Sequence, residues 1–230
     1  VRLISVEDNG IGIPADELPI ALKRHATSKI ANLDELESVG TMGFRGEALA
    51  AIHSVSELSL LSRTAQQDHA MRLDGRSGEL QAAARALGTT VEVKELFYST
   101  PARRKFLKTD ATELAHCVEA VRRHALSRPQ VGFEIWHDGK LVEQWRSQTG
   151  NEALDRRLSD VLGADFLQNS VAIAFAQGNL QVYGRAGIPD AARARADHSR
   201  FGKRSRSSDR HFGRFARSEI ARRPICRWRC

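Results

Sequence analysis

The sequence has few of the features that mark secreted or membrane proteins. It contains only three cysteines, too few and too unevenly spaced for a disulfide framework: Cys117, Cys226 and Cys230. No apolar run approaches the length of a membrane span, and residues 1–6 lack the basic start and apolar middle of a signal peptide. We therefore expect a cytoplasmic protein without membrane contact.

The sequence also lacks an even distribution of charge. Its net charge is +7, but residues 193–230 hold 12 Arg and 1 Lys against 3 acids, whereas residues 1–192 hold 22 basic and 25 acidic side chains. Apolar periodicity also stops near Asp197, which predicts a disordered basic tail over residues 197–230. The tail is either an arm for nucleic acid or the product of a reading-frame slip near residue 197, and we favour the slip.

Before the tail, the 41% hydrophobic content of the 230 residues suits a globular protein with a substantial core. Patterning predicts a strand over residues 3–6, a short helix after Pro14, and helices over 33–37 and from about residue 46. An antiparallel meander follows over residues 57–61, 69–73, 79–81 and 89–93. Later elements are a short helix from Pro101, a long helix capped by Asp110, a hairpin over 133–145, a helix over 151–162, and strands over 171–175 and 180–185.

Asp8 follows the first strand and precedes Gly10 and Gly12. A carboxylate at the end of an apolar strand can accept a hydrogen bond from an exocyclic amine such as that of adenine, while bare glycine backbone lets the ring approach. Two glycines near a turn also occur by chance in many loops. The pattern gains weight only from its context.

A second glycine motif comes just before a helix start, and it contains no Walker lysine. Such glycines can present several backbone N–H groups to phosphates, and the helix dipole favours anions there. The alternative to a phosphate-binding loop is an ordinary loop that begins a helix. The motif consists of Gly43, Phe44, Arg45, Gly46, Glu47, Ala48 and Leu49.

Two weaker motifs complete the candidate site. Residues 25–30 supply Thr27, Ser28 and Lys29, whose hydroxyls and cation suit a loop that closes over phosphates. His25 has no partnered nucleophile nearby, which disfavours a catalytic role. Gly88 and Thr89 begin a strand, where the Thr89 hydroxyl could reach the pocket floor, although threonine also favours strands by propensity alone.

In this order and spacing, the motifs resemble the GHKL superfamily of ATP-binding proteins, which includes type II DNA topoisomerases, a heat-shock chaperone, histidine kinases and MutL. Three segments are similar to motifs of the MutL mismatch-repair family, namely residues 25–30, 43–49 and 97–107. The Thr100-Pro101-Ala102-Arg103-Arg104 stretch disfavours the other members. The resemblance extends from Val1 to about Asp197.

The resemblance implies an α/β (α+β) two-layer sandwich of the GHKL ATPase type, followed by the start of a ribosomal-protein-like second α/β domain. We expect an ATP-binding domain over residues 1–129, a partial second domain over 130–196, and the aberrant tail over 197–230. It further implies that Asp8 binds adenine with support from Thr89, and that Gly10 and Gly12 shape the base pocket. Thr27, Ser28 and Lys29 would belong to the lid, and residues 43–49 would wrap the triphosphate.

The resemblance also implies partners and a cofactor. In the family, ATP drives dimerisation of two such regions into a DNA-associated clamp that works with the mismatch-recognition protein MutS and with a downstream nuclease and helicase. We therefore expect ATP, DNA and a second copy as partners, in a bacterial, nucleoid-associated setting.

Family members also carry, before the position of Asp8, a helix whose Glu activates water and whose Asn holds Mg²⁺, and this sequence contains neither. Loss of a general base costs about 10²–10⁴ in rate. We therefore expect this chain to be deficient in ATP hydrolysis, and the sequence leaves open whether it acts as an enzyme. The alternative is a non-enzymatic fragment with a residual nucleotide pocket and nonspecific DNA binding through its Arg-rich tail, with a possible contribution from residues 103–105.

Overall fold

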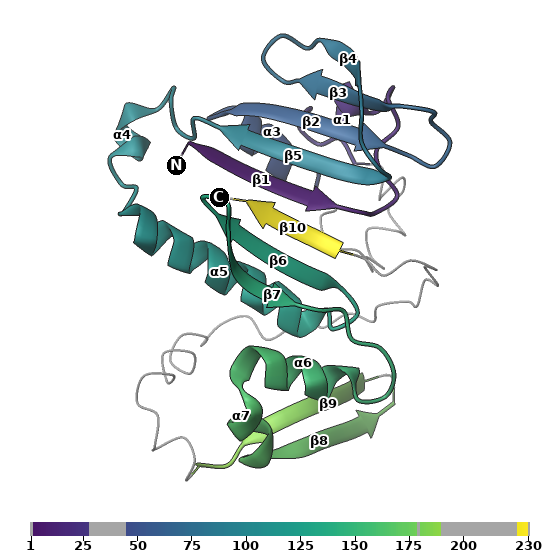
Figure 1. Ribbon diagram of the computed structural model, residues 1–230, viewed down its shortest axis with the longest axis vertical. Coiled ribbons are helices and arrows are strands. Elements are labelled where there is room, and N and C mark those ends of the chain that lie inside the picture. Colours follow the sequence, from purple (N-terminus) through teal and green to yellow (C-terminus); the bar gives the residue numbers. More distant parts are fainter. Residues whose placement is uncertain (1, 28–44, 179, 190–224, 230) are drawn as a thin grey trace.

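The computed structural model describes residues 2–27, 45–178, 180–189 and 225–229. Its main feature is a mixed eight-stranded sheet in the order β4-β3-β2-β5-β1-β10-β6-β7 (Figure 1). The strands are β1 (Leu3–Asp8), β2 (Glu57–Arg63), β3 (Ala70–Asp74), β4 (Leu80–Ala83), β5 (Gly88–Lys94), β6 (Gly132–His137), β7 (Lys140–Trp145) and β10 (Ile225–Arg229). β1 therefore lies in the middle of the sheet and delivers Asp8 to the end of a central strand.

The predicted strands form, but they do not make a simple meander. β2, β3 and β4 pair antiparallel in sequence order, whereas β5 returns beside β2 and inserts between β2 and β1. Alternating hydrophobicity predicts that a segment is a strand without saying which neighbour it pairs with. This arrangement places the start of β5 next to the end of β1.

The tail is not wholly irregular, because residues 225–229 form β10. This strand pairs antiparallel with β1, where Ser5 lies opposite Arg229, and parallel with β6, where Gly132 lies opposite Ile225. The expectation of disorder over residues 197–230 is therefore wrong for this segment, and the rest of that range lies outside the described residues. Strand pairing depends on backbone N–H and C=O groups, so a segment without an apolar face can still join two strand edges.

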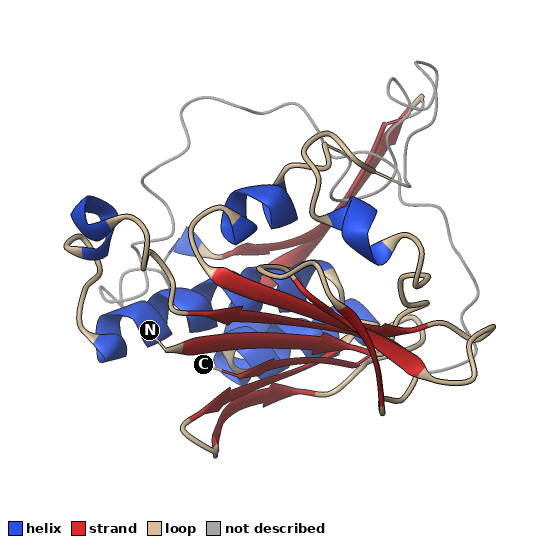
Figure 2. Cartoon of the chain, turned by 90° about the horizontal axis from the view of Figure 1, so that it is seen from above, coloured by secondary structure: helices blue, strands red, loops and turns tan. Residues whose placement is uncertain are grey.

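Helices lie along one face of the large sheet (Figure 2), giving the expected two-layer α/β sandwich. They are α1 (Leu18–Ala21), α3 (Ala48–His53) and α5 (Asp110–Ser127), whereas the short α4 (Pro101–Arg104) lies beyond the strand ends and buries none of its residues. The predicted helix over 33–37 lies outside the described residues. Thr109, and not Asp110, caps α5, because its hydroxyl accepts a hydrogen bond from the Thr112 N–H at 3.4 Å. Threonine and aspartate both serve as N-caps, so the start of this helix could be predicted only to within one residue.

Two apolar clusters hold the helices to the sheet. The first joins α1 to β2, β3 and β5 through the buried side chains of Leu18, Leu58, Leu60, Leu73 and Val93. The second joins α5 to β6 and β7 through Val121, Ala125, Phe133, Ile135 and Trp145. Burying each of these larger side chains contributes about 1.5–3 kcal/mol before the entropy of ordering is subtracted.

The remaining elements form a smaller unit beyond β7 (Figure 1). It contains α6 (Ala153–Leu162), α7 (Ala164–Gln168) and a two-stranded sheet of β8 (Ser170–Gln177) and β9 (Leu180–Gly187). Because β6 and β7 belong to the large sheet, the domain boundary expected after residue 129 does not coincide with a break in that sheet. The break comes after β7.

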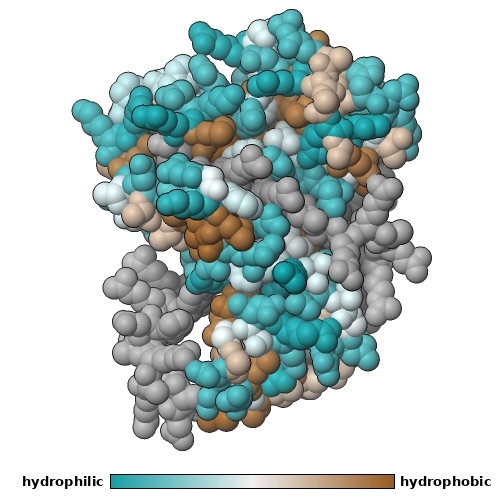
Figure 3. Space-filling model, in the orientation of Figure 1, coloured by the Kyte–Doolittle hydropathy of each residue, from teal (hydrophilic) through white to brown (hydrophobic). Residues whose placement is uncertain are grey.

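The β8–β9 hairpin leaves large apolar side chains open to solvent. Val171, Phe175 and Leu180 are each more than half exposed, with relative exposures of 54%, 54% and 56%. Brown, apolar surface is visible at the end of the molecule where this hairpin lies (Figure 3). The hairpin is tied to α6 by the paired side chains of Arg185 and Asp155, whose Nη2 and Oδ2 atoms lie 2.6 Å apart.

Candidate functional site

Asp8 stands at the end of β1 with its carboxylate fixed by two backbone N–H groups. Its Oδ1 atom accepts hydrogen bonds from Gly10 at 2.8 Å and from Thr89 at 3.2 Å. Both bonds use Oδ1, and among the described residues none donates a hydrogen bond to Oδ2. The side chain is exposed, so the second oxygen is available to a ligand that carries an N–H group.

A buried hydroxyl pair lies below this turn. The Ser62 hydroxyl accepts the Ile13 N–H at 2.7 Å, donates to the Gly88 carbonyl at 3.1 Å and lies 3.0 Å from the Thr89 hydroxyl. Ser62 has no exposed surface, and Thr89 is almost as deeply buried. The two hydroxyls therefore connect β2, β5 and the segment after Gly12 beneath Asp8.

Two glycines let the backbone come this close. Gly12 has φ +80°, and a Cβ there would overlap the carbonyl group of Arg63. Gly88 has φ +122°, and a Cβ there would overlap the Asp8 carbonyl oxygen. Residues other than glycine rarely adopt these backbone conformations, so both positions require glycine on two separate grounds.

The second group of predicted residues lies around Gly46. The His25 N–H donates to the Gly46 carbonyl at 3.1 Å, and a Cβ on Gly46, whose φ is +60°, would overlap the Ala26 backbone. The structure thus brings the segment that contains Thr27 against Arg45, Gly46 and Glu47. Ser28, Lys29, Gly43 and Phe44 lie outside the described residues.

The residues that follow Gly46 have separate surroundings. Ala48 begins α3, whereas Leu49 packs against the first apolar cluster and so contributes to the core. The exposed side chains of His25 and Glu47 lie 3.6 Å apart. The described part of the site therefore consists of a fixed acceptor at Asp8 and a glycine loop that leads into α3.

Two residues that touch the Asp8 turn, Ser62 and Arg85, were not predicted from the sequence. Ser62 could have been noticed as a polar residue inside an otherwise apolar strand. Arg85 gave no signal, because it lies in an alanine-rich connection, yet its guanidinium donates to the Asp8 carbonyl at 2.7 Å.

An open groove of about 890 Å³ lies beside this turn and is not the predicted base pocket. Its lining contains neither Asp8 nor the glycines, but it includes Arg63 and Arg85, which both contact the turn. The lining consists of Arg63, Asp68, His69, Ala70, Ala82, Ala83, Ala84, Arg85 and Ala86.

The described residues contain neither a metal-binding cluster nor a membrane-spanning helix. No group of three His, Cys, Asp or Glu side chains there is arranged to hold a metal ion. Within the same ranges, no helix is both long and apolar enough to cross a membrane.

Comparison with known proteins identifies relatives over most of the chain. The DNA mismatch repair protein MutL of Ralstonia nicotianae is 53% identical over 201 residues, which cover 87% of this chain and 31% of that protein. MutL of Histophilus somni is 49% identical over 85% of this chain and 32% of its own length. The chain thus spans about a third of the length of these relatives, and no protein-family model matches it.

Solved structures share the fold. The Aquifex aeolicus MutL ATPase domain complexed with ADP matches 76% of this chain and 60% of its own, with a TM-score of 0.55 and 28% identity. The N-terminal domain of a DNA repair protein matches 80% of this chain and 58% of its own, with a TM-score of 0.60 and 25% identity. These likenesses confirm the expected α/β sandwich of the GHKL ATPase type.

Proposed function

Because this chain is homologous over most of its length to bacterial MutL proteins and has the fold of MutL ATPase domains, we propose that it binds ATP as part of a DNA mismatch repair protein. The observation that carries the proposal is the Asp8 carboxylate, held through Oδ1 by the N–H groups of Gly10 and Thr89. A nucleotide was bound in one of the structures that share this fold, as ADP.

In the proposed complex, Oδ2 of Asp8 accepts a hydrogen bond from the 6-amino group of adenine. Gly10 and Gly12 shape the turn against which the ring lies, and Thr89 holds the carboxylate in place. The support is geometric, since the carboxylate is fixed on one side and open on the other, and the glycine at position 12 lets the turn after Asp8 pack directly against the Arg63 carbonyl.

The phosphate end is proposed on the sequence of the glycine loop. Residues 43–49 would place backbone N–H groups around the triphosphate, and Thr27, Ser28 and Lys29 would close over it. The contact between His25 and Gly46 supports this, because it brings the two loops together. We assign neither hydrolysis nor an Mg²⁺ ligand to any residue of this chain.

The proposed cellular role is that of the relatives. ATP binding would favour dimerisation of the ATPase region and formation of a clamp on DNA, working with MutS and with a downstream nuclease and helicase in the bacterial nucleoid. We also propose two structural units, one built on the large sheet through β7 and a second that contains α6, α7, β8 and β9.

Calorimetry with ATP tests the proposal. We expect Asp8→Ala to abolish measurable binding, because the acceptor for the amino group is lost. Asp68→Ala is the matched control, since Asp68 is an exposed carboxylate on the neighbouring groove and should leave the affinity unchanged. Equal ATP affinities of the wild type and Asp8→Ala would exclude Asp8 from adenine recognition.

A second candidate function, nonspecific DNA binding by the tail, is favoured by the concentration of 12 Arg in residues 193–230. Replacing the arginines of residues 193–223 by glutamine keeps β10 and removes the charge. If the tail binds DNA, this variant loses affinity and the slope of log affinity against log salt becomes shallower. Unchanged affinity and slope would place the DNA contact in the folded part.

A further inference from the structure

Arg85 holds the piece of backbone that carries Asp8. Its Nη2 donates to the Asp8 carbonyl at 2.7 Å, its Nη1 to the Ala86 carbonyl at 2.9 Å, and its Nε to the Thr90 hydroxyl at 2.9 Å. One guanidinium therefore joins the end of β1 to the connection before β5 and to β5 itself. These partners lie 77, 1 and 5 residues from Arg85 along the chain.

Only a guanidinium suits this position among the ordinary side chains. The three bonds leave the planar group from three different nitrogens, which an ammonium group on a single atom cannot reproduce. Burial lowers the pKa of Arg85, whereas the nearby charges of Asp8 and Glu7 raise it. Arginine nevertheless stays protonated at any physiological pH, so the three donors persist.

The carbonyl that Arg85 binds belongs to the same residue as the candidate adenine acceptor. The Asp8 carbonyl oxygen lies so close to Gly88 that a Cβ there would overlap it, and the neighbouring Thr89 N–H donates to the Asp8 carboxylate. Arg85 holds the carbonyl of Asp8, and the N–H groups of Gly10 and Thr89 hold its Oδ1 atom. The direction in which Oδ2 points is therefore restricted. Arg85 itself makes its contact through the backbone of Asp8 and not through the carboxylate.

We propose that Arg85 is a positioning residue for base recognition, which sets the direction of the Asp8 carboxylate toward the 6-amino group of adenine without touching the nucleotide. The proposal rests on the proposed function, because it assumes that Asp8 accepts this amino group. The hydrogen bond from Arg85 to the Asp8 carbonyl would then help the site to distinguish adenine from purines that lack the 6-amino group.

The test compares two ligands on the full chain by calorimetry: ATP, and purine riboside triphosphate, which lacks only the 6-amino group. A hydrogen bond to a charged acceptor contributes enough to make wild-type affinity about tenfold or more higher for ATP. Arg85→Ala should reduce this ratio to about threefold or less, mainly by weakening ATP binding. Arg85→Lys, which can restore one of three bonds, should give an intermediate ratio.

Arg76→Ala is the control, because Arg76 is an exposed arginine whose guanidinium donates to Glu57 at 3.3 Å, at the end of β2 opposite to the one that lies beside Gly88. It should leave the ratio at the wild-type value. Thermal melting of every variant reports folding, and if Arg85→Ala does not fold, Arg85→Lys and Arg85→Gln decide the question in its place.

The outcomes separate the two proposals. A wild-type chain that binds both ligands equally would remove Asp8 from amine recognition and so overturn the proposed function together with this inference. A discriminating wild type with an equally discriminating Arg85→Ala would overturn the positioning role alone. An equal loss of affinity for both ligands would also overturn it, because that result indicates general support of the fold.

Discussion

The Thr89 N–H donates a hydrogen bond to Oδ1 of Asp8 over 3.2 Å, although 81 residues separate the two positions. This contact joins the Asp8–Gly12 motif to the Gly88–Thr89 motif in a single site, although each motif is weak evidence when it is considered alone. It exists because β5 pairs with β1 in the register that places Glu7 opposite Thr90. The first residues of β5 therefore lie beside the residue that ends β1.

Gly88→Ala should destabilise the fold by about 2–5 kcal/mol. The alanine would adopt an unfavourable φ of +122° and its Cβ would overlap the Asp8 carbonyl. Gly78→Ala is the control, because Gly78 has φ +74° but no atom within 4 Å of a Cβ, and strain alone should cost about 1 kcal/mol. Urea denaturation measures both, and equal losses would contradict the predicted overlap.

Ser62→Ala should cost about 2 kcal/mol of unfolding free energy. The substitution leaves the Ile13 N–H without its acceptor and the buried Thr89 hydroxyl without its partner. Ser54→Ala removes an exposed hydroxyl that bonds only the Ala51 carbonyl, so it should change stability by less than about 0.5 kcal/mol. A neutral Ser62→Ala in chemical denaturation would show that the hydroxyl pair does not stabilise the turn.

Arg157→Ala should be the most destabilising arginine substitution in the smaller unit, at about 3–5 kcal/mol. Arg157 has no exposed surface, and its guanidinium donates to four backbone carbonyls, those of Ala125, Pro129, Val131 and Arg146. Removing it takes away one donor from each of these carbonyls and opens a cavity, although the Gln148 N–H still donates to the Pro129 carbonyl at 2.8 Å and the Arg128 N–H to the Ala125 carbonyl at 3.4 Å.

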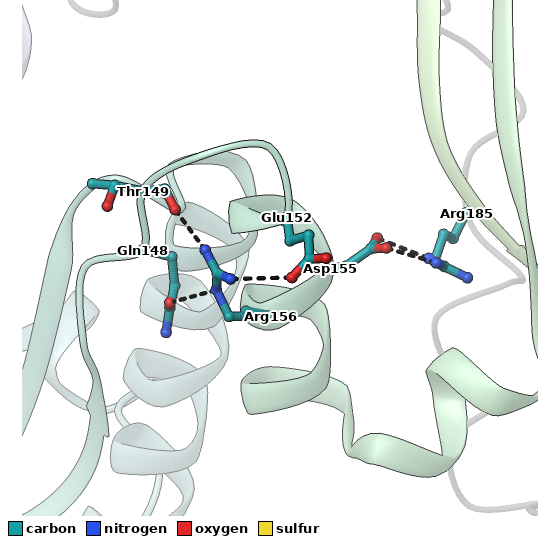
Figure 4. Close-up of polar contacts among 6 residues, drawn as sticks. All are labelled: Gln148, Thr149, Glu152, Asp155, Arg156 and Arg185. Atoms are coloured by element: carbon teal, nitrogen blue, oxygen red, sulfur yellow. Dashed lines mark hydrogen bonds and ion pairs between the residues drawn. The ribbon is translucent and has the colours of Figure 1, made fainter.

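The neighbouring residue provides the matched control. Arg156 bonds Gln148, Thr149 and Glu152 on the surface of α6 (Figure 4), and Arg156→Ala should cost no more than about 1 kcal/mol. Thermal melting of the two variants side by side makes the comparison. Similar losses of stability in the two variants would contradict the prediction that the buried Arg157 stabilises the fold more than the exposed Arg156 does.

The Asp155–Arg185 pair should make the attachment of β9 to α6 dependent on pH. Arg185 donates to both oxygens of Asp155, at 2.8 and 2.6 Å, and these bonds lower the pKa of Asp155 (Figure 4). Since the pKa is lower in the folded state, the pair stabilises above the ordinary aspartate value of about 3.9, and this stabilisation is lost as pH falls below it.

The measurement is the difference in melting temperature between wild type and Asp155→Asn. We expect a constant difference from pH 7 to about pH 5, which shrinks below about pH 4 as the wild-type carboxylate is protonated. Arg185→Met should show the same pH dependence, because it removes the other partner. A difference that persists undiminished into acid would assign the effect to packing.

The errors at the level of the fold have a common physical origin. The sequence predicted β2, β3, β4 and β5 as strands, but neither the place of β5 beside β1 nor the attachment of β6 and β7 to the same sheet. β10 was missed because pairing through backbone groups needs no apolar pattern. A side-chain pattern describes one face of one segment, whereas pairing depends on which strand edges are left open.

At the site, the family motifs, the strand that ends at Asp8 and the glycines around it could all be predicted from the sequence, because they depend on local backbone geometry and residue type. That Thr89, Ser62 and Arg85 meet at this turn became evident only from the three-dimensional fold. Their hydrogen bonds join segments that are far apart along the chain, and no local rule of spacing or propensity specifies such contacts.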